Sequence, residues 1–295
     1  MSYPAIFDRR LLRARRARAA FDPVTFLIER SAEDLAVRLS AVLRTFNLAV
    51  DLGTPSDAVR RRLVDRVGAI VAVNPIAAHI ASERLAVASD EEALPFRDGT
   101  IDLVVSALAL QFVNDLPGTL IQIRRALKPD GLLLAAMIGG DSLAELRAAF
   151  AAAEAEVEGG ISPRVAPFAD LRDLGALLQR AGFALPVTDV DRITVRYASP
   201  LALMHDLRRM GAGNVLMARR RAPLRRATLR RMFDIYAHRF ADADGRIRAT
   251  FEIIWLSGWA PHQSQQQPLT PGSARARLAD ALNSKELPVG EKAPR

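Results

Sequence analysis

The sequence VDLGTPSDA (residues 50–58) decides the fold, because it places an acid and a glycine directly after a short apolar run. A turn of this composition between a strand and a helix is where doubly wound α/β sheets bind nucleotides. Further apolar runs follow at 69–75, 84–90, 100–108 and 132–139, and segments with helical spacing separate most of them. Such alternation is typical of a parallel sheet buried on both faces. The pattern therefore predicts a doubly wound, mostly parallel α/β sheet.

Two later segments, 186–197 and 246–259, alternate between apolar and polar residues and predict two antiparallel strands. They complete a Rossmann-like sheet of seven strands. Between them, residues 199–243 have a largely helical pattern and are too long for a plain connection. We therefore expect a helical insertion there, acting as a lid or a docking element. Ahead of the first strand, residues 31–45 predict a helix that Ser31 caps.

Shifts in composition divide the chain into three parts. Residues 1–30 are rich in arginine and predict a basic, partly helical arm. Residues 31–262 contain all the predicted strands and form the expected globular domain. Residues 263–295 are polar and rich in Gln and Pro, so we expect a disordered tail.

The positive charge of the chain comes almost entirely from arginine. The formal net charge is +8, and arginines cluster at Arg9–Arg18 and Arg219–Arg231. Such clusters favour an acidic partner protein or an anionic membrane surface. No aromatic residues interleave with them to stack bases, which argues against nucleic acid. Because the sequence has no cysteine and no apolar run of membrane-spanning length, we expect a cytoplasmic protein, at most peripheral to the inner membrane face.

The residues themselves give little support to metal or nucleophile chemistry. The histidines, His79, His205, His238 and His262, lie in different predicted elements. They suggest no set of two histidines and one carboxylate, so we expect no metal site. No nucleophile-elbow motif is present. The catalytic residues therefore stay unassigned.

The surroundings of the loop indicate a superfamily. The stretches SDEEALPFRDGTIDLVVSALALQFV (89–113) and RRALKPDGLLLAAM (124–137) follow VDLG in the order found in class I S-adenosylmethionine (SAM) methyltransferases. Residues 47–138 thus resemble that superfamily, in its methyltransferase type 11 form. The resemblance implies SAM as the cofactor and these cofactor-binding positions: Asp51, Gly53, Asn74, Asp90, Glu91 and Ser106. Ser106 would line the floor near the sulfonium.

The resemblance also implies a role for each of the other positions. Asp51 would anchor the loop and approach the amino group of SAM, while Gly53 would let the backbone come close. Asn74 stands where an acid normally binds both ribose hydroxyls. Asp90 and the backbone of Glu91 would meet the edge of the adenine.

Three residues depart from the family's D-x-G-x-G-x-G loop and its ribose-binding acid. Pro55 stands at the second glycine, where its ring adds bulk and its nitrogen cannot donate. Asp57 replaces the third glycine and brings a carboxylate toward the expected carboxylate of SAM. Asn74 replaces the acid and gives up charge-assisted hydrogen bonds to the ribose. Together they leave two outcomes equally open: SAM binding that is retained, and SAM binding that is weak or lost.

Longer motifs narrow the resemblance further. FDRRLLRARRARAA (7–20), GGDSLAELR (139–147) and RDLGALLQRAGF (172–183) resemble the respiratory complex I assembly factor 5 family, and the likeness extends over nearly the whole chain. That family implies hydroxylation of an arginine on the quinone-proximal iron–sulfur subunit of complex I. The basic arm and the helical insertion would then be docking surfaces for this protein substrate.

Two alternatives remain open. SALALQF (106–112) also fits the biotin-synthesis O-methyltransferase that esterifies malonyl on its carrier protein, and an acidic carrier would suit the basic clusters. The degenerate loop equally fits a protein that keeps the methyltransferase fold as a non-catalytic assembly or binding module. Gln111, Asp115 and Arg147 face the expected substrate entrance, but the sequence fixes no role for them.

Overall fold

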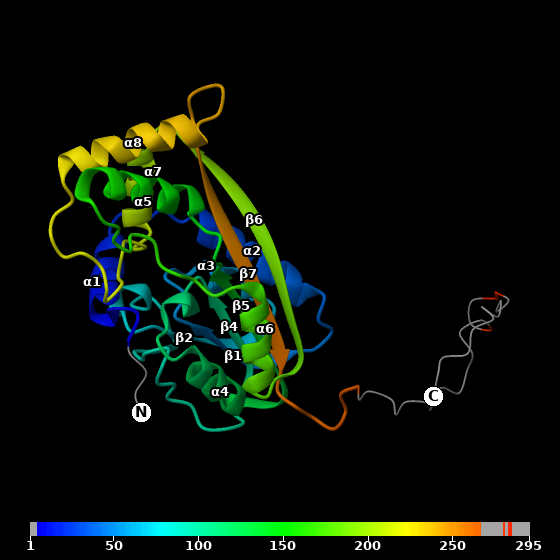
Figure 1. The fold of residues 1–295 in the computed structure, drawn as a ribbon. Helices are drawn as coiled ribbons and strands as arrows, with labels where there is room; N and C mark the ends of the chain where they lie inside the picture. Colours follow the sequence, from blue (N-terminus) through cyan, green and yellow to red (C-terminus); the bar gives the residue numbers. More distant parts are fainter. Residues whose placement is uncertain (1–4, 267–279, 281–282, 285–295) are drawn as a thin grey trace. The chain divides into compact units, whose positions relative to one another are not determined.

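The computed structural model describes residues 5–266, 280 and 283–284, and its core is a seven-stranded sheet of order β3-β2-β1-β4-β5-β7-β6 (Figure 1). The strands are β1 (Phe46–Leu52), β2 (Val67–Val73), β3 (Ala86–Val87), β4 (Ile101–Ala107), β5 (Leu127–Ile138), β6 (Ala184–Tyr197) and β7 (Ile247–Trp259). Strands β1 to β5 pair in parallel, and β7 pairs antiparallel with both β5 and β6. The predicted doubly wound, mostly parallel sheet is confirmed.

Helices cover both faces of this sheet. They are α1 (Arg9–Ala19), α2 (Phe26–Ser40), α3 (Ala58–Leu63), α4 (Leu116–Ala126), α5 (Ala144–Glu158), α6 (Leu171–Arg180), α7 (Pro200–Arg209) and α8 (Arg226–Phe240), with short 3-10 turns η1 (Ala77–His79) and η2 (Leu110–Phe112). Leu103 and Val105 of β4 pack into one core with α2 and α5, whereas Val104 between them packs into the other with α4 and α6. This alternation places apolar side chains on both faces, as a buried parallel strand requires.

Some local predictions were wrong. Ser31 does not cap a helix, since it lies inside α2 and its hydroxyl donates to the carbonyl of Leu27 at 2.8 Å. The helix begins five residues earlier than predicted, at Phe26, because Leu27 and Ile28 are buried in the core and extend the apolar face. The strand predicted over 84–90 shrinks to Ala86–Val87, since the residues after it turn toward α1.

The segment expected to be an arm packs against the sheet. Asp8 caps α1 by accepting from the backbone N–H of Leu11 at 2.9 Å. Phe7 and Leu12 are buried against Phe112 of η2. An antiparallel bridge joins Phe7 to Leu216 in the predicted insertion. Helix α1 therefore lies over the edge of the sheet where the parallel strands end.

The predicted insertion contains α7 and α8, which gather with α5 at one end of the long β6–β7 pair (Figure 1). The chain divides into a compact unit, Met1–Pro261, and the segment His262–Arg295. Most of the predicted tail (263–295) lies outside the described residues. No helix in the described part of the chain is long and apolar enough to cross a membrane.

Candidate functional site

The six predicted cofactor positions meet at the carboxyl edge of the parallel strands, and we call them the strand-end row: Asp51, Gly53, Asn74, Asp90, Glu91 and Ser106. Strands β1, β2 and β4 bring them together because parallel strands all end at the same edge of a sheet. Four of the side chains, those of Asp51, Asn74, Glu91 and Ser106, are almost fully buried. What each of them contacts decides what the row can bind.

Asp51 is bound within the protein. Its carboxylate accepts hydrogen bonds from the hydroxyl of Thr54 and from Nη1 of Arg60. Arg60 comes from α3 and also contacts Glu83 at 2.8 Å. Burial raises the pKa of Asp51 to about 6, although the charge of Arg60 and the Thr54 hydrogen bond oppose the shift. The carboxylate predicted to approach SAM thus faces a guanidinium of the same chain.

Asn74 and Ser106 are likewise engaged by the backbone. Asn74 donates from Nδ2 to the carbonyl of Thr54 at 3.1 Å and accepts at Oδ1 from the backbone N–H of Ile76 at 2.9 Å. The hydroxyl of Ser106 donates to the carbonyl of Leu52 at 2.7 Å. These bonds tie the ends of β1, β2 and β4 together.

Helix α1 neutralises the two acids that follow β3. Arg9 Nη2 lies 2.6 Å from Asp90 Oδ1 and also contacts the carboxylate of Glu91. Arg13, one helical turn further on, binds the second oxygen of Asp90. Part of the positive charge at the start of the chain is therefore neutralised by acids of the same chain.

Gly53 has a positive φ of 72°, which favours glycine. A Cβ at this position would lie 2.6 Å from Oε1 of Glu91 and 2.9 Å from Cβ of Ala109. The open side of Gly53, expected to admit a cofactor, is thus filled by a side chain of the protein. Further along the loop, Asp57 is exposed and lies 3.1 Å from Nε of Arg61.

The strand-end row therefore does not fit SAM in the manner implied by the resemblance. The carboxylates of Asp51, Asp90 and Glu91 are paired with arginines, and the amide of Asn74 bonds to backbone groups. SAM would have to displace charge-assisted hydrogen bonds, which are about twice as strong as neutral ones. We therefore assign no chemical step to SAM in this structure.

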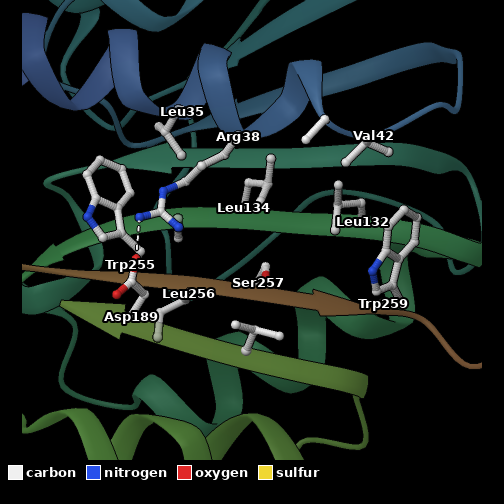
Figure 2. Close-up of a pocket in the computed structure, with 13 residues that line it drawn as sticks. Leu35, Arg38, Val42, Leu132, Leu134, Asp189, Trp255, Leu256, Ser257 and Trp259 are labelled. Atoms are coloured by element: carbon white, nitrogen blue, oxygen red, sulfur yellow. Dashed lines mark hydrogen bonds and ion pairs between the residues drawn. The ribbon is translucent and has the colours of Figure 1, made fainter. Parts of the chain in front are cut away.

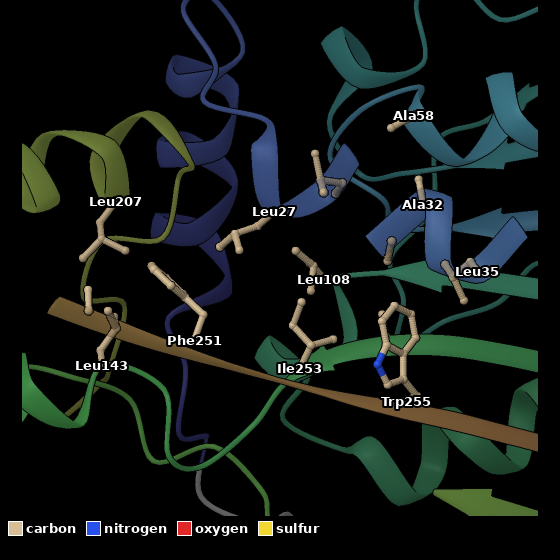
Figure 3. Packing of buried hydrophobic residues seen from close by; sticks show 14 of the residues in the cluster. Leu27, Ala32, Leu35, Ala58, Leu108, Leu143, Leu207, Phe251, Ile253 and Trp255 are labelled. Atoms are coloured by element: carbon tan, nitrogen blue, oxygen red, sulfur yellow. The ribbon is translucent and has the colours of Figure 1, made fainter. Parts of the chain in front are cut away.

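A cavity of about 660 Å³ adjoins the row, and we call it the arginine-lined cavity. Its walls come from α1, the start of α2, η1, η2, α5, α7 and the segment 212–215, and Pro55 of the loop reaches it as well. None of the strand-end row residues lines it among the described residues. Figure 3 shows Leu27, Leu143, Leu207 and Phe251, from four different parts of the chain, gathered around this region.

Two residues that line the cavity each have a buried polar atom without a hydrogen-bond partner in the described part of the chain: Gln111 at Oε1 and His79 at Nδ1. Gln111 donates from Nε2 to the carbonyl of Leu108 at 2.9 Å. A carbonyl can only accept, so the amide orientation is fixed and Oε1 is the free acceptor. Leu108 has a φ of 51°, a strained conformation for leucine, and its carbonyl also accepts from Arg16 Nη2 at 3.0 Å.

Sequence reasoning recognised Gln111 but not the individual importance of Arg16 or His79. Arg16 lies four residues after the buried Leu12, so both share one face of α1, and that spacing could have singled it out. His79 gives no comparable sequence signal. Burial, followed by the charges of Arg16 and Arg60, lowers the pKa of His79 to about 4.

A smaller cavity of about 270 Å³ lies between α2 and strands β5, β7 and β6 (Figure 2). Arg38 Nη2 there lies 2.6 Å from Asp189 Oδ2, and the guanidinium carbon is 4.6 Å from the centre of the Trp255 ring. Because this cation and this acid are paired, the cavity offers a ligand no free charge. Within the described residues, no group of three or more His, Asp or Glu side chains could hold a metal ion.

Comparison with known proteins shows which families the chain is related to. Residues 50–135 match a methyltransferase domain family. The human protein named arginine-hydroxylase NDUFAF5, mitochondrial, is 40% identical and the alignment covers 97% of this chain and 86% of the human one. The mouse protein of that name is 39% identical, with coverage of 97% and 87%. The chain belongs to the NDUFAF5 arginine-hydroxylase family. Membership confirms the resemblance to the complex I assembly factor family.

More distant relatives of this NDUFAF5 family member carry another name. A malonyl-[acyl-carrier protein] O-methyltransferase of Halorhodospira halophila is 33% identical, covering 91% of this chain and 93% of that protein. Among solved structures, the YcgJ protein of Bacillus subtilis superposes with a TM-score of 0.54 at 13% identity, covering 78% of this chain and 99% of that one. A methyltransferase of Bacillus halodurans gives 0.51 at 16% identity, with coverage of 77% and 99%. These structures support the methyltransferase fold.

Proposed function

We propose that this protein hydroxylates an arginine side chain of a complex I subunit, the quinone-proximal iron–sulfur subunit, while the complex is assembled. The observation that carries the proposal is the 40% identity to the human arginine-hydroxylase NDUFAF5 over almost the whole of both chains. The match extends beyond the methyltransferase core of residues 50–135, so it includes α1 and the helical insertion that build the arginine-lined cavity.

Hydroxylation replaces a C–H bond of the arginine side chain by C–O–H. With dioxygen as the source of oxygen, one oxygen atom enters the product and the other leaves as water. That balance needs two electrons and two protons, so the reaction requires dioxygen and a two-electron reductant as co-reactants. Neither the oxidant nor the reductant is assigned a binding residue.

Gln111 is the group best suited to contact the substrate arginine. Its side chain lines the arginine-lined cavity, and its Oε1 is a buried acceptor without a partner among the described residues. A guanidinium carries only donors, so one N–H of the substrate would satisfy this oxygen. An unsatisfied buried acceptor costs about 1–3 kcal/mol, which substrate binding would recover.

Exposed arginines supply the docking surface in this proposal. Arg10 of α1 is exposed, as are Arg221, Arg226 and Arg230 in and before α8, and these four form no ion pair within the described residues. Free positive charge of this kind favours an acidic surface on the partner and speeds its association. An anionic membrane face next to that partner would be attracted as well.

The proposal also covers SAM binding and the location of the protein in the cell. Membership of a methyltransferase domain family suggests SAM as a ligand, but the internal pairing of the strand-end row leads us to propose weak binding. The NDUFAF5 relatives are named as mitochondrial proteins. For this chain we propose a place in the cytoplasm, peripheral to the inner membrane face where its partner subunit is assembled.

The test is peptide mass spectrometry of the partner iron–sulfur subunit after incubation with the purified full-length protein, dioxygen and a chemical reductant. We expect one arginine to gain one oxygen atom. Gln111→Leu should lower the yield at least tenfold, while Gln179→Leu, at an exposed glutamine of α6 outside the cavity, serves as the control. No oxygen gain with the natural protein under any reductant would overturn the proposal.

A carrier-protein O-methyltransferase is the second candidate. The arginines of the cavity complement a carboxylate, and the Halorhodospira halophila relative carries that name. Methyl-ester formation on a malonyl carrier protein in place of arginine hydroxylation would establish it. If neither product forms and the chain still binds the iron–sulfur subunit, a non-catalytic assembly module is the remaining reading.

A further inference from the structure

Arg16 carries a buried charge without a counter-ion. Its side chain is only 6% exposed, and it forms no ion pair within the described residues. Nη2 donates to the carbonyl of Leu108 at 3.0 Å, and the guanidinium carbon lies 5.3 Å from the centre of the Phe112 ring. Burial lowers the pKa of Arg16 to about 10, although the charge of Glu91, which is itself paired with Arg9, opposes the shift. Arg16 therefore remains protonated at neutral pH. An unpaired buried charge is costly unless an anion joins it.

The other charges of the arginine-lined cavity do not offset it. Two more of its arginines are paired, Arg164 with Glu154 and Arg209 with Asp22. Arg15, Arg18 and Arg208 also line it, and they form no ion pair in the part of the chain that the structure describes.

The other titratable groups that line the cavity do not neutralise its arginines. Asp22 is the acid among the described lining residues, and its carboxylate is already bound to Arg209. His79 is neutral above a pH of about 4. The cavity therefore carries an excess of positive charge, and Arg16 is the most buried of its arginines among the described residues.

Apart from a few polar residues such as Gln111 and Ser142, the rest of the wall is apolar. The hydrophobic lining includes Leu27, Ile28, Leu108, Phe112, Leu143, Leu146, Phe150 and Phe251. Figure 3 shows how Leu27, Leu143 and Phe251 approach this region from different elements. The volume of about 660 Å³ lies within the roughly 300–1,000 Å³ of ordinary small-molecule sites. A ligand that matches this wall needs an apolar body as well as a negative charge.

We propose that the arginine-lined cavity binds an organic anion with an apolar body, whose charged group contacts Arg16 and whose chain or ring lies against the leucine and phenylalanine side chains. A fatty-acyl carboxylate and an alkyl phosphate share this chemistry. A bound anion would also lower the electrostatic cost of bringing any cationic group next to Arg16. The anion would share the cavity in which we place the substrate arginine, but its binding is argued from charge, burial and volume and not from hydroxylation.

The test is titration calorimetry of the full-length protein with three probes of equal chain length: decanoate, decyl phosphate and decanol. We expect both anions to bind at least tenfold more tightly than the neutral alcohol, since only they pair with Arg16. The stronger of the two anions identifies the head group, and either ranking supports the proposal. Because the measured quantity is binding heat, a failed hydroxylation assay leaves this result intact.

Two variants test whether Arg16 is the residue that binds the charged group of the ligand. Arg16→Gln should weaken decanoate binding at least tenfold and remove the preference for decanoate over decanol. Arg180→Gln removes an exposed arginine of α6, outside the cavity, and should bind like the natural protein. Thermal unfolding of both variants checks that they fold. If Arg16→Gln does not fold, the comparison of decanoate with decanol on the natural protein decides.

Three outcomes would overturn the proposal. The first is equal affinity of the natural protein for decanoate and decanol, which would leave only an apolar cavity. The second is unchanged decanoate binding by a folded Arg16→Gln variant. The third is the absence of binding by either anion at millimolar concentration.

Discussion

In the strand-end row each buried acid is paired with a cation, whereas among the described residues of the adjoining arginine-lined cavity a buried cation has no counter-ion and a buried acceptor has no donor. Asp51 is paired with Arg60, and Glu91 with Arg9. Arg16 has no counter-ion, and Oε1 of Gln111 has no donor. Both regions lie at the carboxyl edge of the same sheet, so the fold places them equally well for binding.

The difference between the strand-end row and the cavity indicates which groups of the protein are available to bind a ligand. Side chains that bond to each other stabilise the fold and have little left to offer a ligand. Groups that stay unsatisfied in the folded protein lower its stability until a ligand completes them. At the ordinary cofactor edge of the methyltransferase fold the acids are held by arginines of the chain, whereas the unpaired groups belong to residues that line the cavity under α1.

The largest expected effect is the removal of Asp51. Asp51→Ala leaves the buried Arg60 with Glu83 as its acid and the carbonyl of His79 as its other partner. Breaking a buried pair typically costs about 3–5 kcal/mol. We expect a loss of about 3 kcal/mol in the free energy of unfolding, measured by urea denaturation. Asp57→Ala removes an exposed acid from the same loop and should change stability by less than about 0.5 kcal/mol. Equal effects of the two changes would show that Asp51 is not structural.

Removal of Arg9 should have the next largest effect. Arg9→Ala leaves Glu91, which is 1% exposed, without its cation. Because the partly exposed Asp90 can still bind Arg13, we expect a loss of about 2 kcal/mol in urea denaturation. Arg10→Ala, on the exposed side of the same helix, is the matched control and should be nearly neutral. If Arg9→Ala left the free energy of unfolding unchanged, the ion pairs of the strand-end row would not be structural, and the contrast with the cavity would be wrong.

His79 should make the protein sensitive to acid. Its folded pKa of about 4 lies below its ordinary value of 6.5, so between these values the unfolded state takes up a proton that the folded state does not. Stability is therefore fully present above pH 6.5 and falls as the pH drops toward 4. Relative to His79→Gln, we expect a loss of about 2 kcal/mol at pH 4, allowing for partial exposure. Parallel pH profiles of the two proteins would contradict the buried, neutral state of this histidine.

The smallest effect concerns SAM. In titration calorimetry we expect the natural protein to show no saturable binding at micromolar concentration. The triple change Pro55→Gly, Asp57→Gly, Asn74→Asp should improve the affinity by less than tenfold, or about 1.4 kcal/mol, because Arg9 still holds Asp90 and Glu91. Adding Arg9→Ala to the triple variant should increase the gain. Micromolar binding by the natural sequence would show that the row opens for its cofactor.

Local sequence patterns were sufficient to predict the parallel strands of the sheet. Apolar runs of strand length, separated by turns and helical spacing, predicted the parallel strands, because a strand buried on both faces must be apolar throughout. The same patterns placed Asp51, Asn74 and Ser106 at strand ends, where the structure has them. They misplaced the start of α2, since the burial of Leu27 and Ile28 extends the helix ahead of Ser31, which resembles a cap in sequence alone.

The sequence by itself thus determined the fold and the residues at the carboxyl edge, whereas the tertiary structure decided their partners. Arg9 is 81 residues from Asp90, and Arg16 is 92 residues from Leu108. No local pattern encodes contacts at such separations, because they form only when α1 packs across the sheet. The same packing leaves Arg16 facing a cavity without a counter-ion while it pairs Arg9. Which arginine is structural and which is free for a ligand is therefore a property of the folded molecule.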